Sequence, residues 1–119
     1  MKNSIALFSM LLASLAAHSQ STEPVNMTTE EVLALIKGKT IQTQNTRWGS
    51  VRLNFQENGI VWASGNGFNH KGAWKVEEGK LCLDGQKFDF EGCGAMRKVG
   101  GEIQHLWPKG EVHFTHQLP

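Results

Sequence analysis

The spacing of glycine constrains the fold of this chain more than any other feature of its sequence. All but one of its 13 glycines lie from Gly49 onward, and they separate short runs in which apolar and polar residues alternate, such as Val51 to Phe55. Alternation with a period of two gives a strand one apolar face, and glycine supplies the backbone conformations that tight turns require. The pattern predicts a mainly β protein: a small antiparallel meander of about seven or eight strands that forms a half-barrel, a barrel or a curled sheet.

The dipeptide Asn58-Gly59 is the strongest single hairpin signal in the sequence. It favours a type I′ turn, in which both central residues have positive φ, and such a turn would place Phe55 opposite Trp62. A further turn is expected at Asp84-Gly85, before a strand or packed loop that contains Phe90.

The segment before the glycine-rich region predicts one short N-terminal helix. Thr28 fits an N-cap, and Glu31, three residues later, completes a capping box. Lys37-Gly38 is a common helix ending. We expect the helix to span Thr29 to Lys37 and to plug the sheet or lean on it. Its apolar stripe consists of Val32, Leu33, Leu35 and Ile36.

The N-terminus has the pattern of a secretory signal peptide. Lys2 precedes an apolar run of 13 residues from Ile5 to Ala17, and Ala17-His18-Ser19 offers small residues for cleavage after Ser19, with Ala16 or Ala17 as alternative ends. A retained membrane anchor is the other interpretation, but a spanning helix needs about 20 residues. We therefore predict a signal peptide over residues 1–19, a flexible lead-in over residues 20–27, and a single disulfide-tied β domain over residues 28–119 that is periplasmic or secreted and has no membrane span.

Cys82 and Cys93 are the only cysteines. A turn at Glu78-Gly79 would pair Val76 with Leu81 on the core face, so Cys82 would lie on the other face. An exported chain meets an oxidising environment, which predicts a disulfide between the two cysteines. The alternative is a cysteine-based metal or redox site, but the spacing is not C-x-x-C.

Charge argues against nucleic acid as a partner. Without Lys2 the chain keeps 11 of its 12 Lys and Arg, which equals its 11 Asp and Glu. A general nucleic-acid binder needs a basic face that displaces counterions from phosphates. We expect a monomer whose partner is a small ligand or another protein.

Three side chains form a candidate metal site. If Pro108-Lys109-Gly110 is a three-residue loop, His105 faces His113; if Gly100-Gly101 is a two-residue turn, Met96 faces His105. The three would then lie in a row across three neighbouring strands, about 5 Å apart. Thioether and imidazole ligands suit copper, and imidazole also suits zinc. The alternative is a sheet surface without a metal, because a slip of one residue changes the face.

Aromatic residues suggest a binding surface at Trp48, Phe68, His70 and Trp107. Phe68 lies in a polar loop from Asn66 to Lys71, and loops often carry binding residues. Phe68 can equally fold back as a lid on the core, because phenylalanine is usually buried. There is no Gly-x-Ser-x-Gly elbow, and the neighbouring acids Glu77-Glu78 precede a turn glycine, as solvated acids often do. We therefore expect a non-catalytic binding module without a cofactor, with copper or zinc binding as the alternative.

The turns, one tryptophan and the cysteines also resemble those of a known family. The residues that carry the resemblance are Asn58-Gly59, Gly72-x-Trp74-x-Val76, Gly79-x-Leu81-Cys82, Cys93, Gly101-Glu102 and Gly110-x-Val112. They are similar to a family of small exported bacterial proteins that is catalogued as a domain of unknown function. The similarity covers about Thr40 to His116. It implies a signal peptide, a Gly-x-Trp strand and two cysteines that flank a loop, but no catalytic residues.

Overall fold

The computed structural model describes residues 23–85 and 90–119. The signal peptide predicted for residues 1–19 lies outside the described residues. The elements are β1 (Val25–Asn26), α2 (Thr29–Ile36), β2 (Thr40–Asn45), β3 (Gly49–Phe55), β4 (Ile60–Gly65), β5 (Phe68–Glu77), β6 (Lys80–Gly85), β7 (Phe90–Val99), β8 (Glu102–Leu106) and β9 (Val112–Gln117).

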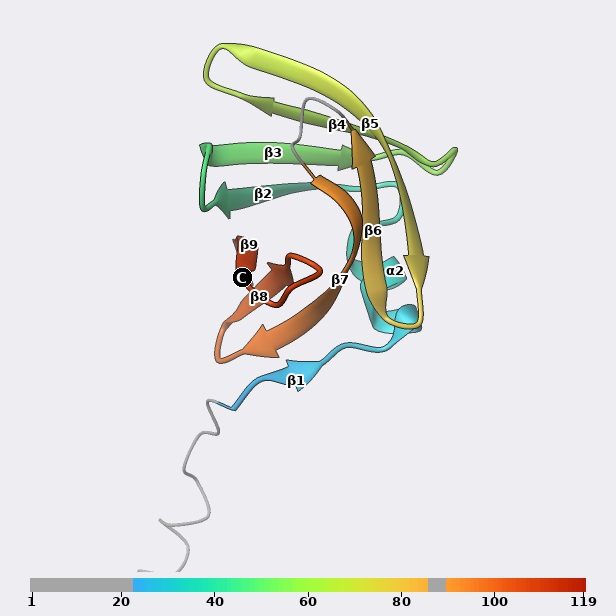
Figure 1. Cartoon of the computed structure of the whole chain (residues 1–119), viewed down its shortest axis with the longest axis vertical. Helices are drawn as coiled ribbons and strands as arrows, with labels where there is room; N and C mark the ends of the chain where they lie inside the picture. Colours follow the sequence, from blue (N-terminus) through green and yellow to red (C-terminus); the bar gives the residue numbers. More distant parts are fainter. Residues whose placement is uncertain (1–22, 86–89) are drawn as a thin grey trace, which may run out of the picture.

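These strands form one antiparallel sheet that closes on itself (Figure 1). Their order is β1-β7-β6-β5-β4-β3-β2-β9-β8, and β8 also pairs with β7, so β2 to β9 make a closed barrel of eight strands. The predicted mainly β meander with a short N-terminal helix is confirmed, and of the three predicted shapes it is the barrel. The flexible lead-in predicted for residues 20–27 needs correction at its end. Val25–Asn26 pairs with Arg97 and Lys98 of β7 as an extra strand, and Met27 is buried.

Helix α2 begins as the sequence predicts. Thr28 Oγ1 accepts a hydrogen bond from the Glu31 amide, and the Glu31 carboxylate accepts one from the Thr28 amide, which completes the capping box. The helix ends at Ile36, one residue before the predicted end. Thr29 Oγ1 accepts a hydrogen bond of 2.7 Å from the Gly79 amide, so the helix rests on the β5–β6 turn. Because its fully buried residues join the barrel core, α2 covers this end of the barrel (Figure 1).

The hairpins predicted at Glu78-Gly79 and at Asn58-Gly59 differ in outcome. Glu78 and Gly79 both have positive φ, which is the type I′ geometry, and Val76 pairs with Leu81 as expected. The Asn58-Gly59 prediction is wrong by one residue, because Phe55 pairs with Val61. Only Gly59 of that dipeptide has positive φ, and its amide bonds to the Gln56 carbonyl, which makes a three-residue loop.

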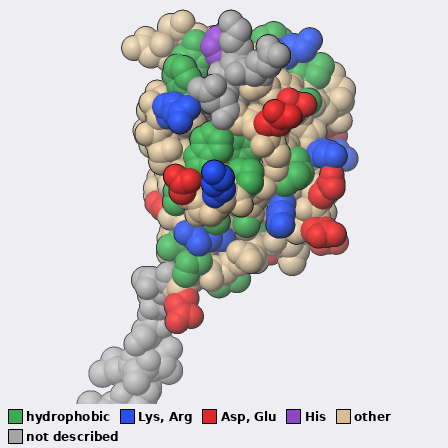
Figure 2. Space-filling model, in the orientation of Figure 1, with side chains coloured by type: hydrophobic (Ala, Val, Ile, Leu, Met, Phe, Trp, Pro, Cys, Tyr) green, Lys and Arg blue, Asp and Glu red, His purple; other side chains and the backbone are tan. Residues whose placement is uncertain are grey.

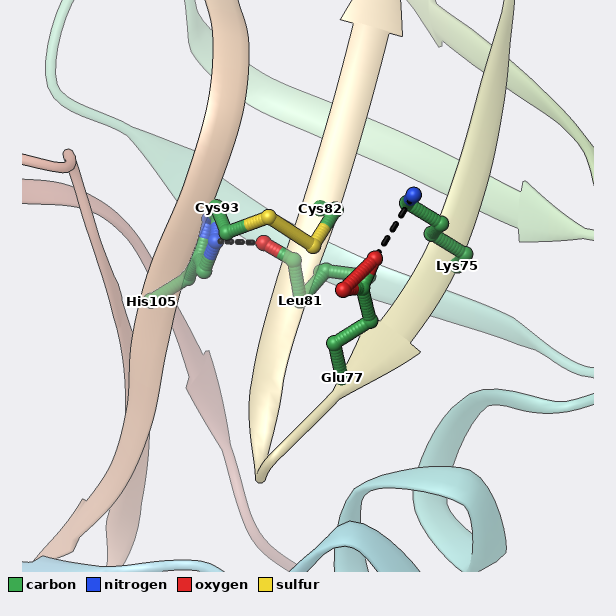
Figure 3. The surroundings of a disulfide bond; sticks show 6 residues. All are labelled: Lys75, Glu77, Leu81, Cys82, Cys93 and His105. Atoms are coloured by element: carbon green, nitrogen blue, oxygen red, sulfur yellow. Dashed lines mark hydrogen bonds and ion pairs between the residues drawn. A yellow bond between two sulfur atoms is a disulfide. The ribbon is translucent and has the colours of Figure 1, made fainter.

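Strand β6 continues through the predicted turn at Asp84-Gly85. Asp84 pairs with Glu91 and Gly85 with Phe90, so that turn prediction is wrong. Further back, Cys82 lies directly opposite Cys93, and the two form the predicted disulfide (Figure 3). This bond ties two neighbouring strands of the barrel wall.

Alternation of strand direction gives the barrel two different ends. The β5–β6 turn and α2 lie at one end. The β2–β3, β4–β5 and β8–β9 turns therefore lie at the opposite end, because each strand reverses the direction of the chain. We call this the open end, because no helix in the described part of the chain covers it, and the candidate site lies inside it.

Gly94 offers a test of the barrel's packing. A Cβ at Gly94 would lie 1.6 Å from the Leu106 carbonyl oxygen, whereas a Cβ at Gly101 would meet nothing within 4 Å. Gly94→Ala should therefore lower the free energy of unfolding by about 3 kcal/mol or more, and Gly101→Ala should change it by no more than about 0.5 kcal/mol. Urea unfolding of both variants measures the difference. Equal stability of the two variants would show that β7 and β8 do not approach so closely.

Candidate functional site

A β-bulge brings two consecutive side chains of β9 into the barrel. Strands β8 and β9 pair His105 with Phe114 and Leu106 with Val112, so His113 is the extra residue. Both His113 and Phe114 are buried, at 6% and 1% exposure. In a regular strand neighbouring side chains point to opposite faces, and a bulge removes that restriction.

The bulge changes the predicted register but keeps the predicted neighbours. The three-residue loop at 108–110 is confirmed by hydrogen bonds between Trp107 and both Glu111 and Gly110. The register then shifts, so His105 pairs with Phe114 rather than with His113. The rings of His105 and His113 still meet, because their Nδ1 atoms are 3.0 Å apart.

A chain of hydrogen bonds runs from the barrel core to the open end. His105 Nε2 lies 3.1 Å from the Leu81 carbonyl oxygen (Figure 3), and its Nδ1 bonds to His113 Nδ1. His113 Nε2 lies 3.2 Å from Asn45 Nδ2. Asn45 Oδ1 accepts hydrogen bonds from the Arg47 and Trp48 amides at 2.8 and 2.9 Å. Side chains from β8, β9 and β2 are thereby joined in one network.

The partners at the two ends of this chain assign the proton on each ring. A carbonyl only accepts, so His105 Nε2 carries a proton and its Nδ1 accepts the bond from His113. His113 then carries its proton on Nδ1 and accepts at Nε2 from the Asn45 amide. The Asn45 orientation agrees, because its oxygen already accepts two backbone amides. Both rings are neutral, and each of their four nitrogens has a partner.

Burial keeps both histidines neutral. Desolvation, followed by the nearby charge of His113 when protonated, lowers the pKa of His105 to about 3, although the bond to Leu81 opposes this. Desolvation, followed by the positive charge of Arg47, lowers the pKa of His113 to about 4. Protonation of His105 would also place its Nδ1–H against the donating Nδ1–H of His113, and protonation of His113 would place its Nε2–H against the donating Asn45 amide.

Met96 completes the predicted row of three. It pairs with His105 as the Gly100-Gly101 turn predicts, and it is fully buried. The row therefore faces the barrel interior, and the alternative of an outer sheet surface is wrong. Among residues 23–85 and 90–119, no group of three His, Cys, Asp or Glu side chains is placed to hold a metal ion. Metal binding by the Met-His-His row stays a prediction.

An apolar cavity lies inside the open end, beside the hydrogen-bonded chain. The volume of this cavity is ≈ 30 Å³, so it is small. We call it the cup; its lining residues are Thr43, Asn45, Trp48, Val51, Leu53, Ala63, Phe68, His70, Leu83, His113 and Phe114.

Three of the four predicted ligand-binding residues meet at this cup. The Trp48 and Phe68 rings lie 5.6 Å apart, and Phe68 stacks on His70 at 5.3 Å. Phe68 packs against the core over Gly65, where a Cβ would lie only 2.5 Å from its ring, so the lid interpretation describes it better than an exposed tip. Trp48 remains 46% exposed.

Trp107 lies apart from these three residues. It stacks on Phe90 at 4.5 Å and lines a separate outer depression with Arg47, Pro108, Lys109 and Glu111. Asn45 and Thr43 belong to the cup but have no distinguishing motif, because a polar residue at the end of a strand is common. The turn that Asn45 makes with the Arg47 and Trp48 amides is the one local signal that points to it.

A second surface lies on the outer face of the barrel wall. Figure 2 shows hydrophobic side chains gathered there, with charged side chains around them. A shallow depression on this face includes Ala73, Cys82 and Cys93 together with Lys75, Asp84 and Glu91. The disulfide thus lies on the opposite side of the wall from the cup.

A family model described as "Protein of unknown function (DUF995)" matches residues 4–114. The chain belongs to this family. Membership in DUF995 confirms the resemblance seen in the turns, the tryptophan and the cysteines. Comparison with curated proteins and with solved structures gives no significant match. In the described part of the chain, no helix has the length and apolar character needed to cross a membrane.

The buried histidines predict acid sensitivity. Their folded-state pKa values lie below the ordinary value of 6.5, so the stability they contribute is fully present above pH 6.5 and is lost as the pH falls toward 4 and 3. In this range each histidine should make the free energy of unfolding fall by about 1.4 kcal/mol for each pH unit of acidification. In the His113→Gln variant the fall should be smaller by the contribution of one histidine, as measured by urea unfolding at several pH values. Parallel pH profiles for wild type and variant would contradict the assignment.

Proposed function

We propose that this DUF995 protein is an exported, non-catalytic binding module that takes a small ligand into the cup. The observation that carries the proposal is an apolar cavity at the one barrel end that α2 does not cover, with a partly exposed tryptophan at its mouth. Ligand sites are typically concave and apolar, with few polar groups that set orientation. Asn45, Thr43 and the histidines supply such groups here.

The architecture supports this proposal in general terms. An eight-stranded barrel has an interior that side chains either fill or leave open for one small ligand. The cup is small, at ≈ 30 Å³, whereas sites for drug-sized ligands have about 300 Å³ or more. A ligand therefore enters by moving the Trp48 ring outward, and this ring is the least buried part of the lining.

The proposal includes export to the periplasm or the cell exterior. It is supported by the charged and apolar pattern of residues 1–19 and by the disulfide, since such bonds persist in oxidising compartments. A protein partner is the competing occupant. It would use the outer face around Cys93, where apolar and charged side chains lie together.

A matched pair of substitutions tests the cup. Ala63 lines the cup, whereas Ala73 lies on the outer face of the same sheet. Ala63→Leu should weaken binding of toluene, a small neutral probe, by about tenfold or more, because three added carbon atoms occupy the cavity. Ala73→Leu should leave binding unchanged. Two-dimensional NMR titration of the Trp48 indole signal gives the affinities, and circular dichroism checks the fold.

Trp48→Ala provides a second test if Ala63→Leu does not fold. This exposed residue can be removed at a small cost in stability. Toluene should still shift signals of Leu53 and Leu83 in this variant, with an altered affinity. Absence of saturable toluene binding to wild type, or equal effects of the two alanine substitutions, would refute the cup as a ligand site.

Metal binding by Met96, His105 and His113 is the second candidate. The observation that favours it is the 3.0 Å distance between the two Nδ1 atoms, close to the about 3.3 Å expected for two nitrogens on one tetrahedral zinc ion. A metal would have to replace the hydrogen bond between them. Copper or zinc should then raise the melting temperature of wild type but not of a His105→Gln, His113→Gln double variant. No rise in wild type removes this candidate.

A further inference from the structure

We propose that the outer face of strands β2, β3 and β4 carries a second binding site, which takes a short acidic saccharide through Trp48 and Arg52. This site goes beyond the proposed function, because it lies on the opposite side of the barrel wall from the cup. Three features support it: an exposed tryptophan, an arginine without an acidic partner, and neighbouring side chains that end in amides and hydroxyls.

Alternation along the strands places Arg52 on the outer face. Arg52 lies between Val51 and Leu53 on β3, and both of these neighbours line the cup. Because neighbouring side chains of a strand point to opposite faces, Arg52 points outward. Strand β3 lies between β2 and β4 (Figure 1), and the register places Gln42 and Ser64 directly opposite Arg52. The three side chains therefore form a row across the outer face.

An open groove passes over this row. Its volume is ≈ 580 Å³, which lies within the range of about 300–1,000 Å³ that is typical of small-molecule sites. The cup, by comparison, has a volume of ≈ 30 Å³. The groove can therefore take a larger ligand than the cup without any movement of its walls. Its lining includes Gln42, Trp48, Ser50, Arg52, Ser64 and Asn66.

Trp48 gives this groove an apolar contact surface. It lines both the cup and the groove, so it stands at the rim between the inside and the outside of the barrel. Asn45 Oδ1 accepts a hydrogen bond from the Trp48 amide, and the Trp48 ring lies 5.6 Å from Phe68, yet 46% of the residue stays exposed. A sugar ring has an apolar face of C–H groups, which leaves water when it packs on an indole.

Arg52 supplies the charge of the site. Among residues 23–85 and 90–119, no carboxylate forms an ion pair with its guanidinium. A guanidinium binds a carboxylate through two parallel hydrogen bonds, and one guanidinium balances one singly charged group. Charge complementarity therefore favours a ligand with a carboxylate beside Trp48.

The remaining polar side chains favour a saccharide over a protein as the carrier of this carboxylate. Amides and hydroxyls can both donate and accept hydrogen bonds, as sugar hydroxyls do. Gln42 Nε2 already donates to Ser50 Oγ at 2.8 Å, which orders this pair. The centre of a protein interface is apolar and contains few serines. Of the groove's described lining residues, by contrast, Trp48 alone is a large apolar one.

Three compounds separate recognition of the sugar from recognition of the charge. Tetragalacturonate has both sugar rings and carboxylates. Its full methyl ester keeps the rings but is neutral, and the peptide tetraglutamate keeps the carboxylates but has no sugar. Isothermal titration calorimetry of the protein at pH 7 should show that tetragalacturonate binds at least about tenfold more tightly than either of the others.

A matched pair of substitutions locates the bound saccharide. Arg52→Gln should weaken tetragalacturonate binding by about tenfold or more, because it removes the partner of the carboxylate. Lys80→Gln removes the same charge from an exposed position beside the β5–β6 turn, at the other end of the barrel, and should change binding by less than about twofold. Trp48→Ala should weaken binding of both saccharides, whereas Ala63→Leu, which fills the cup, should leave it unchanged.

The contrary results are distinct from those that test the cup. Equal weakening by Arg52→Gln and Lys80→Gln, or tetraglutamate bound as tightly as tetragalacturonate, would show general charge attraction and would overturn the site. Equal affinity for the methyl ester would overturn the acidic ligand class. Absence of saccharide binding to wild type would refute the groove as a site and leave the cup, which is tested with toluene, unaffected.

Discussion

Closure of the sheet is the constraint on which the rest of this structure depends. A single sheet with one apolar face must bury that face against another layer or against itself. In the described part of the chain the other layer is one helix of eight residues, which is too small to cover nine strands. The pairings of β7 with β8 and of β9 with β2 let the apolar face bury itself. The interior that results holds both the core and the cup.

The two ends of the barrel differ because, among residues 23–85 and 90–119, a helix covers only one of them. Helix α2 fills one end with Val32 and Ile36, both fully buried. The opposite end has Trp48 and Phe68 over a small void. Between core and mouth runs the chain of hydrogen bonds from Leu81 to Trp48, in which every member has a partner. A buried polar network that is fully satisfied holds its side chains in place, and here it fixes the orientation of Asn45.

Local signals in the sequence predicted the parts of the fold that local geometry determines. The capping box at Thr28 and the turn at Glu78-Gly79 were predicted correctly, because each depends on residues within a few positions. Asn58-Gly59 was misassigned by one residue, because the dipeptide is compatible with loops of two or three residues and only φ at Asn58 separates them.

Features that depend on distant residues were beyond local reasoning. The pairing of Gln44 with Thr115, which helps to close the barrel, has no turn between its strands. No glycine marks the bulge at His113 in the sequence. The predicted pairing of His105 with His113 is therefore wrong, although the two side chains lie close together as predicted. Only the aromatic residues Trp48, Phe68 and His70 of the cup are predicted from the sequence, because its walls come from six different strands.

The central claim is that the inside of this closed sheet, at the end away from α2, receives a ligand. Intermolecular nuclear Overhauser effects between a bound aromatic compound and the protein's methyl groups test it most directly. The account predicts contacts from the compound to the inward-facing methyl groups of Val51, Leu53 and Leu83, all of which line the cup. Contacts restricted to outward-facing methyl groups, such as that of Ala73 beside the disulfide, would contradict it.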